Sequence, residues 1–152
     1  MPRIERSADV VWEGNVARGS GWISARSGAF GDLPYSLATR IGDSDGKTSP
    51  EELLAAAHAG CYAMSLAGEL AGAGSPAERL RVTAKVVMDE VDGSHRVVRS
   101  EVRARARVQG IDGDAFANAA RAADEGCPLS ALIKGSGTVT VNAELEGGTD
   151  GN

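Results

Sequence analysis

The sequence predicts an α+β fold in which antiparallel sheets pack against two main helices. Short runs of alternating polar and apolar residues fill the first forty positions, and a long helix of small and apolar residues starts near residue 50. Two long alternating runs, a second helix and a last strand follow. The 152 residues, with 42% apolar and 24% charged side chains, suit a single domain over 1–152 whose last residues, about 147–152, form a loose tail.

The N-terminal runs are ADVVWEG, GWISARSG and LPYSLATRI. Each is bounded by Gly, Asn, Asp or Pro, which are the residues that favour turns. They predict a small antiparallel unit of three strands.

The start of the long helix is marked by four consecutive residues. Ser49 suits the N-cap, Pro50 the first helical position, and Glu52 the third residue after the cap, as in a capping box. Glu51 also favours the positive end of the helix dipole. The helix is expected to end near Ala73, before the stop signal GAGSP.

Two strands joined by a turn at Asp92-Gly93 are predicted next. One face of each is apolar: Val82, Ala84, Val86 and Met88 in the first, and Val98, Val102, Ala104, Ala106 and Val108 in the second. The opposite face of the second carries Arg99, Glu101, Arg103, Arg105 and Arg107, which we interpret as the wet face of a sheet. A helix over 114–125, a short helix in CPLSALIKG and a strand in TVTVNAEL complete the order.

The net charge indicates which partners are disfavoured, and the N-terminal residues indicate the expected compartment. A formal net charge of −5 disfavours a nucleic-acid partner. The N-terminus has no apolar run of the signal-peptide type, so we expect a cytoplasmic protein with reduced thiols. His58 and Glu69 interrupt the apolar stretch 53–73, which favours a buried helix over a membrane span.

The chain has two cysteines. Cys61 lies in the long helix on a stripe with Leu54, Ala57, Ser65 or Met64, and Gly68, so it is expected on a buried or interface-facing side. Cys127 directly precedes Pro128 at the start of the short helix, where backbone N–H groups stabilise a thiolate. Either cysteine can also be explained as a plain structural residue, Cys61 as a compact apolar one and Cys127 as a weak N-cap. By local pattern, Cys127 is the better reactive candidate.

Four roles for the pair were compared. A metal site lacks ligands, because His58 and His95 are the only histidines and neither has a ligand spacing. A Cys–His hydrolase would pair Cys61 with His58, three residues earlier. A structural disulfide is disfavoured in a reducing compartment. Two-thiol redox chemistry remains the favoured role.

The chain resembles the OsmC branch of the OsmC/organic hydroperoxide reductase family. The resemblance rests on TSPEELLAAAHAGCYAMSL and GCPLSALIKG, whose cysteines are sixty-six residues apart, together with VVWEGNVARGSG, PYSLATRI and VQGID. It covers nearly the whole chain.

The resemblance implies an OsmC-like fold that forms an intertwined homodimer with active sites at the subunit interface. It also implies a thiol-dependent peroxidase in which Cys61 is the peroxidatic and Cys127 the resolving cysteine, the reverse of the local ranking. Arg40 and Glu51 match the charged pair beside the reactive thiol, with Arg18 as the alternative arginine. A guanidinium near Cys61 would favour its thiolate.

No flavin, haem or metal is implied, and the reductant is expected to be an external dithiol, of lipoyl or another small type. The substrate is expected to be an organic hydroperoxide, in an apolar pocket formed by the partner's N-terminal strands and by Ala57, Tyr62 and Leu66, with Trp22, Phe30 and Tyr35 as further lining candidates. The alternative is a redox sensor or small-molecule-binding protein that does not turn over.

Helix geometry constrains where Glu51 acts. Ten residues separate it from Cys61, which is ~15 Å of rise and a difference in direction of roughly 80° on a straight helix. If both residues belong to one site, either Glu51 reaches the cysteine of the other subunit or a long side chain such as Arg40 bridges the gap. We favour the first explanation.

Overall fold

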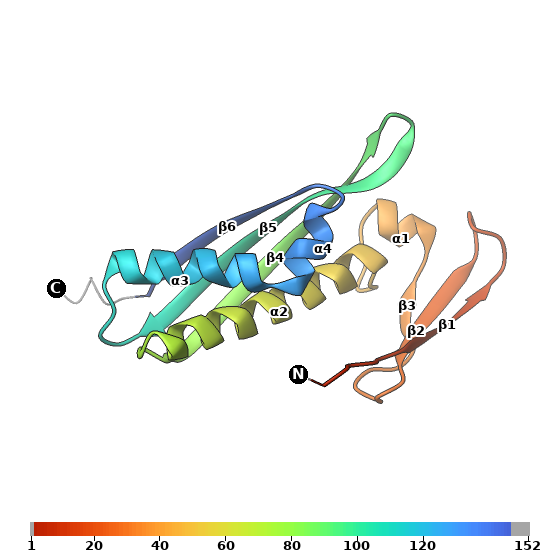
Figure 1. Ribbon diagram of the computed structural model, residues 1–152. Coiled ribbons are helices and arrows are strands. Elements are labelled where there is room, and N and C mark those ends of the chain that lie inside the picture. Colours follow the sequence, from red (N-terminus) through yellow and green to blue (C-terminus); the bar gives the residue numbers. More distant parts are fainter. Residues whose placement is uncertain (1, 147–152) are drawn as a thin grey trace. The chain divides into compact units, whose positions relative to one another are not determined.

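The computed structural model describes residues 2–146, so the predicted loose tail at 147–152 lies outside the described residues. The chain divides into two compact units, the first ending at Leu53 and the second beginning at Leu54. Each unit is described by itself below, with the element labels of Figure 1.

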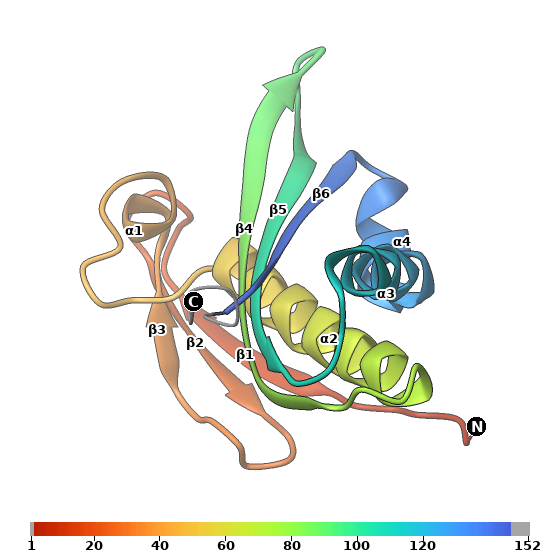
Figure 2. The ribbon, with the colours of Figure 1, turned by 90° about the vertical axis from the view of Figure 1, so that its left-hand side faces the viewer.

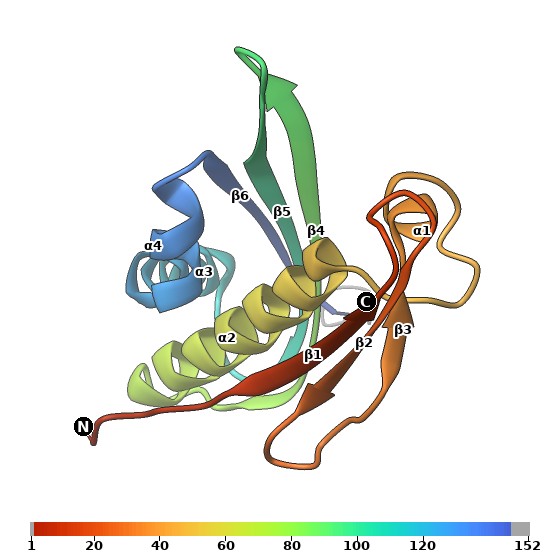
Figure 3. The same ribbon diagram turned by 90° about the vertical axis from the view of Figure 1, so that its right-hand side faces the viewer.

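The first unit contains a three-stranded antiparallel sheet in the order β1-β2-β3. Its strands are β1 (Ala8–Glu13), β2 (Ser20–Ala25) and β3 (Leu33–Tyr35), which lie side by side in Figure 3. Val11 pairs with Trp22, and Trp22 with Pro34. The predicted antiparallel unit is confirmed.

The third predicted strand is shorter than expected, because its second half is a helix, α1 (Leu37–Ile41). Ser36 ends the extended segment and caps α1: its hydroxyl accepts from the Thr39 N–H at 3.2 Å, and Thr39 Oγ1 accepts from the Ser36 N–H at 3.2 Å. This reciprocal capping box supplies the helix start that the alternating pattern concealed.

Close packing of two aromatic rings organises the first sheet. The centroids of Trp12 and Tyr35 are 5.5 Å apart, with their planes at 60°. Gly21 lies between the rings, and a Cβ at this position would overlap both of them. A glycine is therefore required where β1, β2 and β3 meet.

Helix α2 (Pro50–Gly72) starts where predicted, with Ser49 Oγ accepting from the Glu52 N–H at 3.0 Å. The Glu52 carboxylate accepts instead from Thr48 Oγ1, at 2.9 Å. The stripe of Cys61 is not the buried face of α2 in the single chain, whose buried residues are His58, Tyr62, Leu66 and Leu70, so its predicted interface-facing alternative remains. These larger side chains recur every four residues, so they, and not the small residues beside Cys61, fill the core.

The second unit is built on a sheet in the order β4-β5-β6, made of β4 (Ala77–Val91), β5 (Ser94–Val108) and β6 (Thr138–Leu145). The β4–β5 turn has positive φ at Asp92 (51°) and Gly93 (80°), as the predicted hairpin requires. The expectation of antiparallel sheets fails at one pair, because β5 and β6 are parallel. Helices α3 (Gly113–Gly126) and α4 (Pro128–Lys134) lie between these strands in sequence and form the long crossover that a parallel pair needs.

Helices α2 and α3 cover one face of the second sheet, as Figure 2 shows. Tyr62, Leu66 and Leu70 of α2 pack there with Phe116 of α3 and with Val102, Ala104 and Ala106 of β5. The arginines at 99, 103, 105 and 107 are exposed on the other face, as expected of a wet face. Within 2–146, none of the helices is both long and apolar enough to cross a bilayer.

Candidate active site

The two cysteines meet in the second unit. Cys61 of α2 is partly exposed and packs against the core cluster that contains Cys127, which is 1% exposed. Both thiols are free. Residues 66 positions apart are therefore brought together as one accessible and one buried thiol.

Cys127 occupies the junction of two helices. It follows the end of α3 and is the N-cap of α4, with Pro128 in the first helical turn as the sequence predicts. The Ser130 N–H donates to Cys127 Sγ at 3.5 Å. The thiol is thus held by the first turn of α4.

The surroundings of Cys61 favour its protonated form. Burial raises the pKa of the Cys61 thiol above its ordinary value, and the neighbouring Cys127 raises it further, whereas the Leu129 backbone N–H lowers it. None of these neighbours is cationic. A positive charge from elsewhere would favour the thiolate of Cys61.

Arg40 and Glu51 form a two-point ion pair in the first unit. Arg40 Nε donates to Glu51 Oε1 at 2.9 Å, and Arg40 Nη2 donates to Oε2 at 2.6 Å. The side chains are 34% and 19% exposed. The hydrogen bond to Arg40 lowers the pKa of Glu51, and that to Glu51 raises the pKa of Arg40, so the pair stays ionised. The chain brings together the two charged residues that the sequence singles out.

Arg18, the alternative arginine, lies in the turn between β1 and β2 and is exposed. Its backbone N–H donates to Asn15 Oδ1 at 2.9 Å, which shapes that turn. Glu51 is paired with Arg40, so Arg40 is the better candidate of the two.

A cavity of about 190 Å³ adjoins Arg40 within the first unit. Its lining residues are Trp12, Val16, Tyr35, Ser36, Leu37 and Arg40; of the three aromatic candidates, Tyr35 is among them and Trp22 and Phe30 are not. Tyr62 and Leu66 are 0% exposed, so the prediction that they line a substrate pocket is wrong. Their side chains are buried in the core of the second unit.

His58 is fully buried and does not act on Cys61. Its Nδ1 lies 2.7 Å from Ser100 Oγ of β5, and its Nε2 lies 2.8 Å from Ser130 Oγ of α4. Burial lowers the pKa of His58, which keeps the ring neutral. Both nitrogens are occupied, so the arrangement disfavours a Cys61–His58 hydrolase.

The sequence analysis did not identify Ser100 and Ser130 as partners of His58. Ser100 alternates with Val98 and Val102, so its inward position on β5 could be deduced from the strand period. A polar residue at an inward position needs a partner, and the buried histidine is that partner. Ser130 carries no comparable signal in a helix of seven residues.

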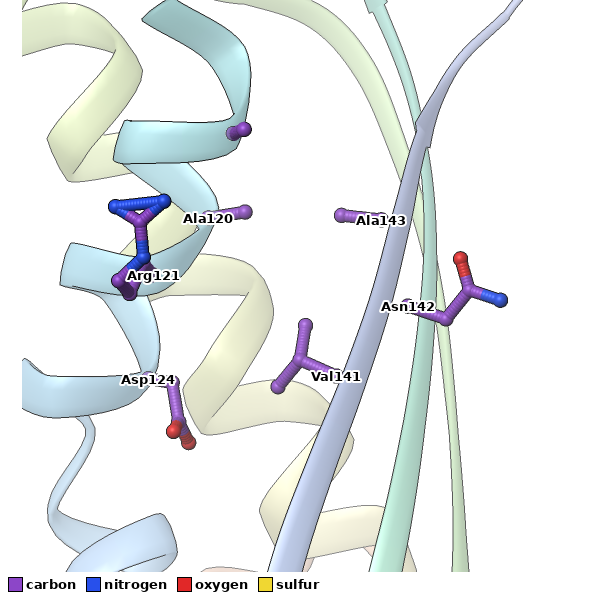
Figure 4. A pocket seen from close by; sticks show the side chains of 7 residues that line it. Ala120, Arg121, Asp124, Val141, Asn142 and Ala143 are labelled. Carbon is purple, nitrogen blue, oxygen red and sulfur yellow. The ribbon is translucent and has the colours of Figure 1, made fainter. Parts of the chain in front are cut away.

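A groove of about 590 Å³ lies between α3 and β6 (Figure 4). Asp124 lies in it; its Oδ2 accepts from Lys134 Nζ at 2.7 Å, and its buried Oδ1 has no hydrogen-bond partner among the described residues. No cluster of three metal-ligating side chains occurs over residues 2–146.

Comparison with known proteins agrees with the resemblance. The family model described as OsmC-like protein matches residues 42–142. Peroxiredoxin OsmC of Escherichia coli (strain K12) is 35% identical over 143 residues, which cover 94% of this chain and 98% of the relative. The counterpart of the same name in Shigella flexneri matches to the same extent.

Solved structures share the fold at lower identity. The organic hydroperoxide resistance protein OhrB of Bacillus subtilis has a TM-score of 0.67 at 24% identity, covering 92% of this chain and 98% of its own. An OsmC-like protein of unknown function from Vibrio cholerae has a TM-score of 0.73 at 15% identity, covering 93% and 99%. With an α+β architecture common to these structures and a relative of 35% identity over nearly its whole length, the chain belongs to the OsmC-like protein family.

Proposed function

We propose that the protein is a thiol-dependent peroxidase that reduces organic hydroperoxides, and hydrogen peroxide less well. The observation that carries this proposal is that a partly exposed thiol, Cys61, lies near a buried one, Cys127, in the core of the second unit. Its family relatives named peroxiredoxin support the same reaction.

In the proposed cycle, the Cys61 thiolate attacks the terminal oxygen of the hydroperoxide. The O–O bond breaks, the alkoxide takes a proton and leaves as an alcohol, and Cys61 becomes a sulfenic acid. The Cys127 sulfur then attacks the Cys61 sulfur, and water leaves as the disulfide forms. An external dithiol, of lipoyl or similar type, returns two electrons by thiol–disulfide exchange.

The guanidinium of Arg40, held by Glu51, is the proposed source of positive charge at the thiol. Helix geometry separates Glu51 from Cys61 of the same α2 by ~15 Å of rise, so we propose that the pair acts on the thiol of the partner subunit in a homodimer. Glu51 holds the guanidinium by two hydrogen bonds and limits its freedom. The guanidinium then stabilises the partner's thiolate and the negative charge of the departing oxygen.

The cavity beside Arg40 is the proposed site for the organic part of the substrate. Trp12, Val16, Tyr35 and Leu37 give it an apolar lining, and Arg40 supplies one polar edge. An apolar group bound there would leave its peroxide end near the guanidinium. Hydrogen peroxide has no group to fill this cavity, which is the basis of the proposed preference.

Peroxide consumption by wild type, Cys61→Ser and Cys127→Ser, with excess dithiol and either cumene hydroperoxide or hydrogen peroxide, tests the proposal. The proposal requires sustained turnover in the wild type and none in Cys61→Ser. Cys127→Ser should consume about one peroxide per chain and then turn over slowly, if a small dithiol can reach the sulfenic acid directly. A single stoichiometric oxidation of the wild type, without turnover, would instead identify a redox sensor.

A further inference from the structure

The buried Ser100–His58–Ser130 network has no part in the peroxide cycle described above. It joins three elements of the second unit, because Ser100 belongs to β5, His58 to α2 and Ser130 to α4. All three residues are 0% exposed. Three polar side chains in a dry core are costly unless each is hydrogen-bonded, so their presence needs an explanation other than packing.

The network reaches the resolving thiol through one residue. Ser130 Oγ lies 2.8 Å from His58 Nε2, and the Ser130 backbone N–H donates to Cys127 Sγ at 3.5 Å. The imidazole therefore fixes the turn of α4 that contains Cys127.

Helix α4 depends on such attachments. It has seven residues, fewer than an isolated helix needs to be stable in water. Its far end is tied by Lys134 to Asp124 at 2.7 Å, and Ser136 Oγ, just beyond it, donates to the Val97 carbonyl at 2.7 Å. At the N-terminal end of α4, next to Cys127, the side chain of Ser130 is held by His58.

We propose that His58 is a positioning residue for disulfide formation: by holding Ser130, it keeps the first turn of α4 where the Cys127 sulfur can attack Cys61. The assignment of Cys127 as the resolving thiol rests on the proposed function. A disulfide requires the two sulfur atoms to approach to about 2.05 Å with a narrow range of dihedral angles. Fixing the backbone of one partner beforehand makes that approach more frequent.

A neutral imidazole suits this role. It has one donor and one acceptor nitrogen, and each serine hydroxyl can rotate to act as the complementary group. The charged groups that act on the ring, Asp124 and Lys134, have opposite effects on its charged form. The Ser100–His58–Ser130 network therefore holds α4 without adding a net charge beside the thiols.

A matched pair of substitutions separates the two bonds of the ring. In His58→Gln the side-chain amide can reach the position of Nε2, toward Ser130, whereas in His58→Asn it can reach only that of Nδ1, toward Ser100. Both variants remove the ring and leave a buried amide. The proposal predicts that they differ in disulfide formation, and a purely structural role predicts that they do not.

The measurement follows the reaction with dithiobis(nitrobenzoate), which needs no peroxide. Partly exposed Cys61 forms a mixed disulfide and releases a first nitrothiobenzoate. Cys127 then loses its proton to solvent and attacks the Cys61 sulfur, which releases the second and forms the Cys61–Cys127 disulfide. The first phase reports Cys61 and the second reports Cys127.

We expect the second phase to be slowed roughly tenfold in His58→Asn and in Ser130→Ala, and less than about threefold in His58→Gln, with the first phase unchanged throughout. Ser130→Ala is a small change that keeps the fold accessible to test if the histidine variants unfold. Lys134→Met is the control, since it releases the other end of α4.

Equal second-phase rates in wild type, His58→Asn and Ser130→Ala would overturn the proposal, as would equal slowing in both histidine variants. Failure of the peroxidase proposal is separately recognisable. In that case the wild type would complete both phases with the disulfide reagent and still show no turnover of hydroperoxide.

Discussion

Among the described residues up to Leu53 the buried ones are Gly21, Ile23 and Thr48, whereas the second unit buries side chains from α2, β5, α3 and α4. The first unit instead exposes Val10 and Val11, at 53% and 58%. The charged half of the candidate site, Arg40 with Glu51, lies in the first unit, and the thiol half lies in the second.

The two units therefore differ in what they contribute to the proposed site. The second unit has a core of its own and holds its thiols in neutral surroundings that raise the pKa of Cys61. The first unit has little core and carries the Arg40–Glu51 ion pair. In the proposed homodimer the partner would supply what each unit lacks. The exposed valines of the first unit would be buried against the partner, and the thiol of the second unit would gain the partner's guanidinium. The following predictions test that comparison.

The largest expected effect is on stability. Leu66→Ala should lower the free energy of unfolding by about 2–5 kcal/mol, because it empties a fully buried site in the core of the second unit. Urea unfolding followed by circular dichroism measures it. Val11→Ala in the first unit is the comparison: its effect should shrink as the protein concentration falls below the dimer dissociation constant, because Val11 is exposed in the free subunit. An effect of Val11→Ala that is independent of concentration would argue against burial by a partner.

Arg40→Ala should slow the reaction of Cys61 with hydroperoxide by about a hundredfold, because the thiolate and the departing oxygen lose their cation. Stopped-flow measurement of peroxide consumption in a single turnover isolates this step. Arg18→Ala is the matched control, since its side chain is also an arginine of the first unit but lies in an exposed turn. A loss as large in Arg18→Ala would mean that the wrong arginine has been chosen.

Glu51→Gln should slow the same step by about tenfold, less than Arg40→Ala, because the guanidinium remains but is less well held. A loss equal to that of Arg40→Ala would instead indicate that the carboxylate itself takes part in the reaction. The comparison requires both rates at one pH and salt concentration.

The smallest expected effect concerns pH. Burial holds the pKa of His58 below its ordinary value, so below about pH 6.5 the unfolded chain binds a proton that the folded chain does not. The contribution of neutral His58 to stability is complete above that pH and is lost as the pH falls toward the folded pKa. Thermal unfolding of wild type from about pH 8 to 5 should therefore show a drop that His58→Gln lacks. Parallel curves for the two proteins would contradict it.

Much of the fold was predictable from the sequence because its signals are local. The cap at Ser49, the Asp92-Gly93 turn and the alternation in β4, β5 and β6 depend on residues close together in the chain. The α1 helix was missed because residues 33–41 alternate as a strand does, which concealed the capping box of Ser36 and Thr39. The parallel pairing of β6 was missed because strand direction depends on where the α3–α4 crossover returns the chain.

The candidate site divides in the same way. The proximity of Cys61 and Cys127 was anticipated through the family resemblance, since sixty-five intervening residues leave no local signal. The pairing of Arg40 with Glu51 had the same origin. His58 looked like a neighbour of Cys61 by its spacing of three, but the buried face of α2 carries it toward Ser100 and Ser130.

The central claim, that Arg40 and Glu51 of one subunit serve the thiol of the other, is tested most directly by mixing two defective variants. Cys61→Ser lacks the thiol and Arg40→Ala lacks the cation, so each alone should be nearly inactive. After unfolding and refolding together in equal amounts, half of the dimers should be mixed, and each of these has one intact site if the site is shared between subunits. The account predicts recovery of roughly a quarter of wild-type peroxidase activity. Activity no greater than the sum of the two separate variants would contradict it.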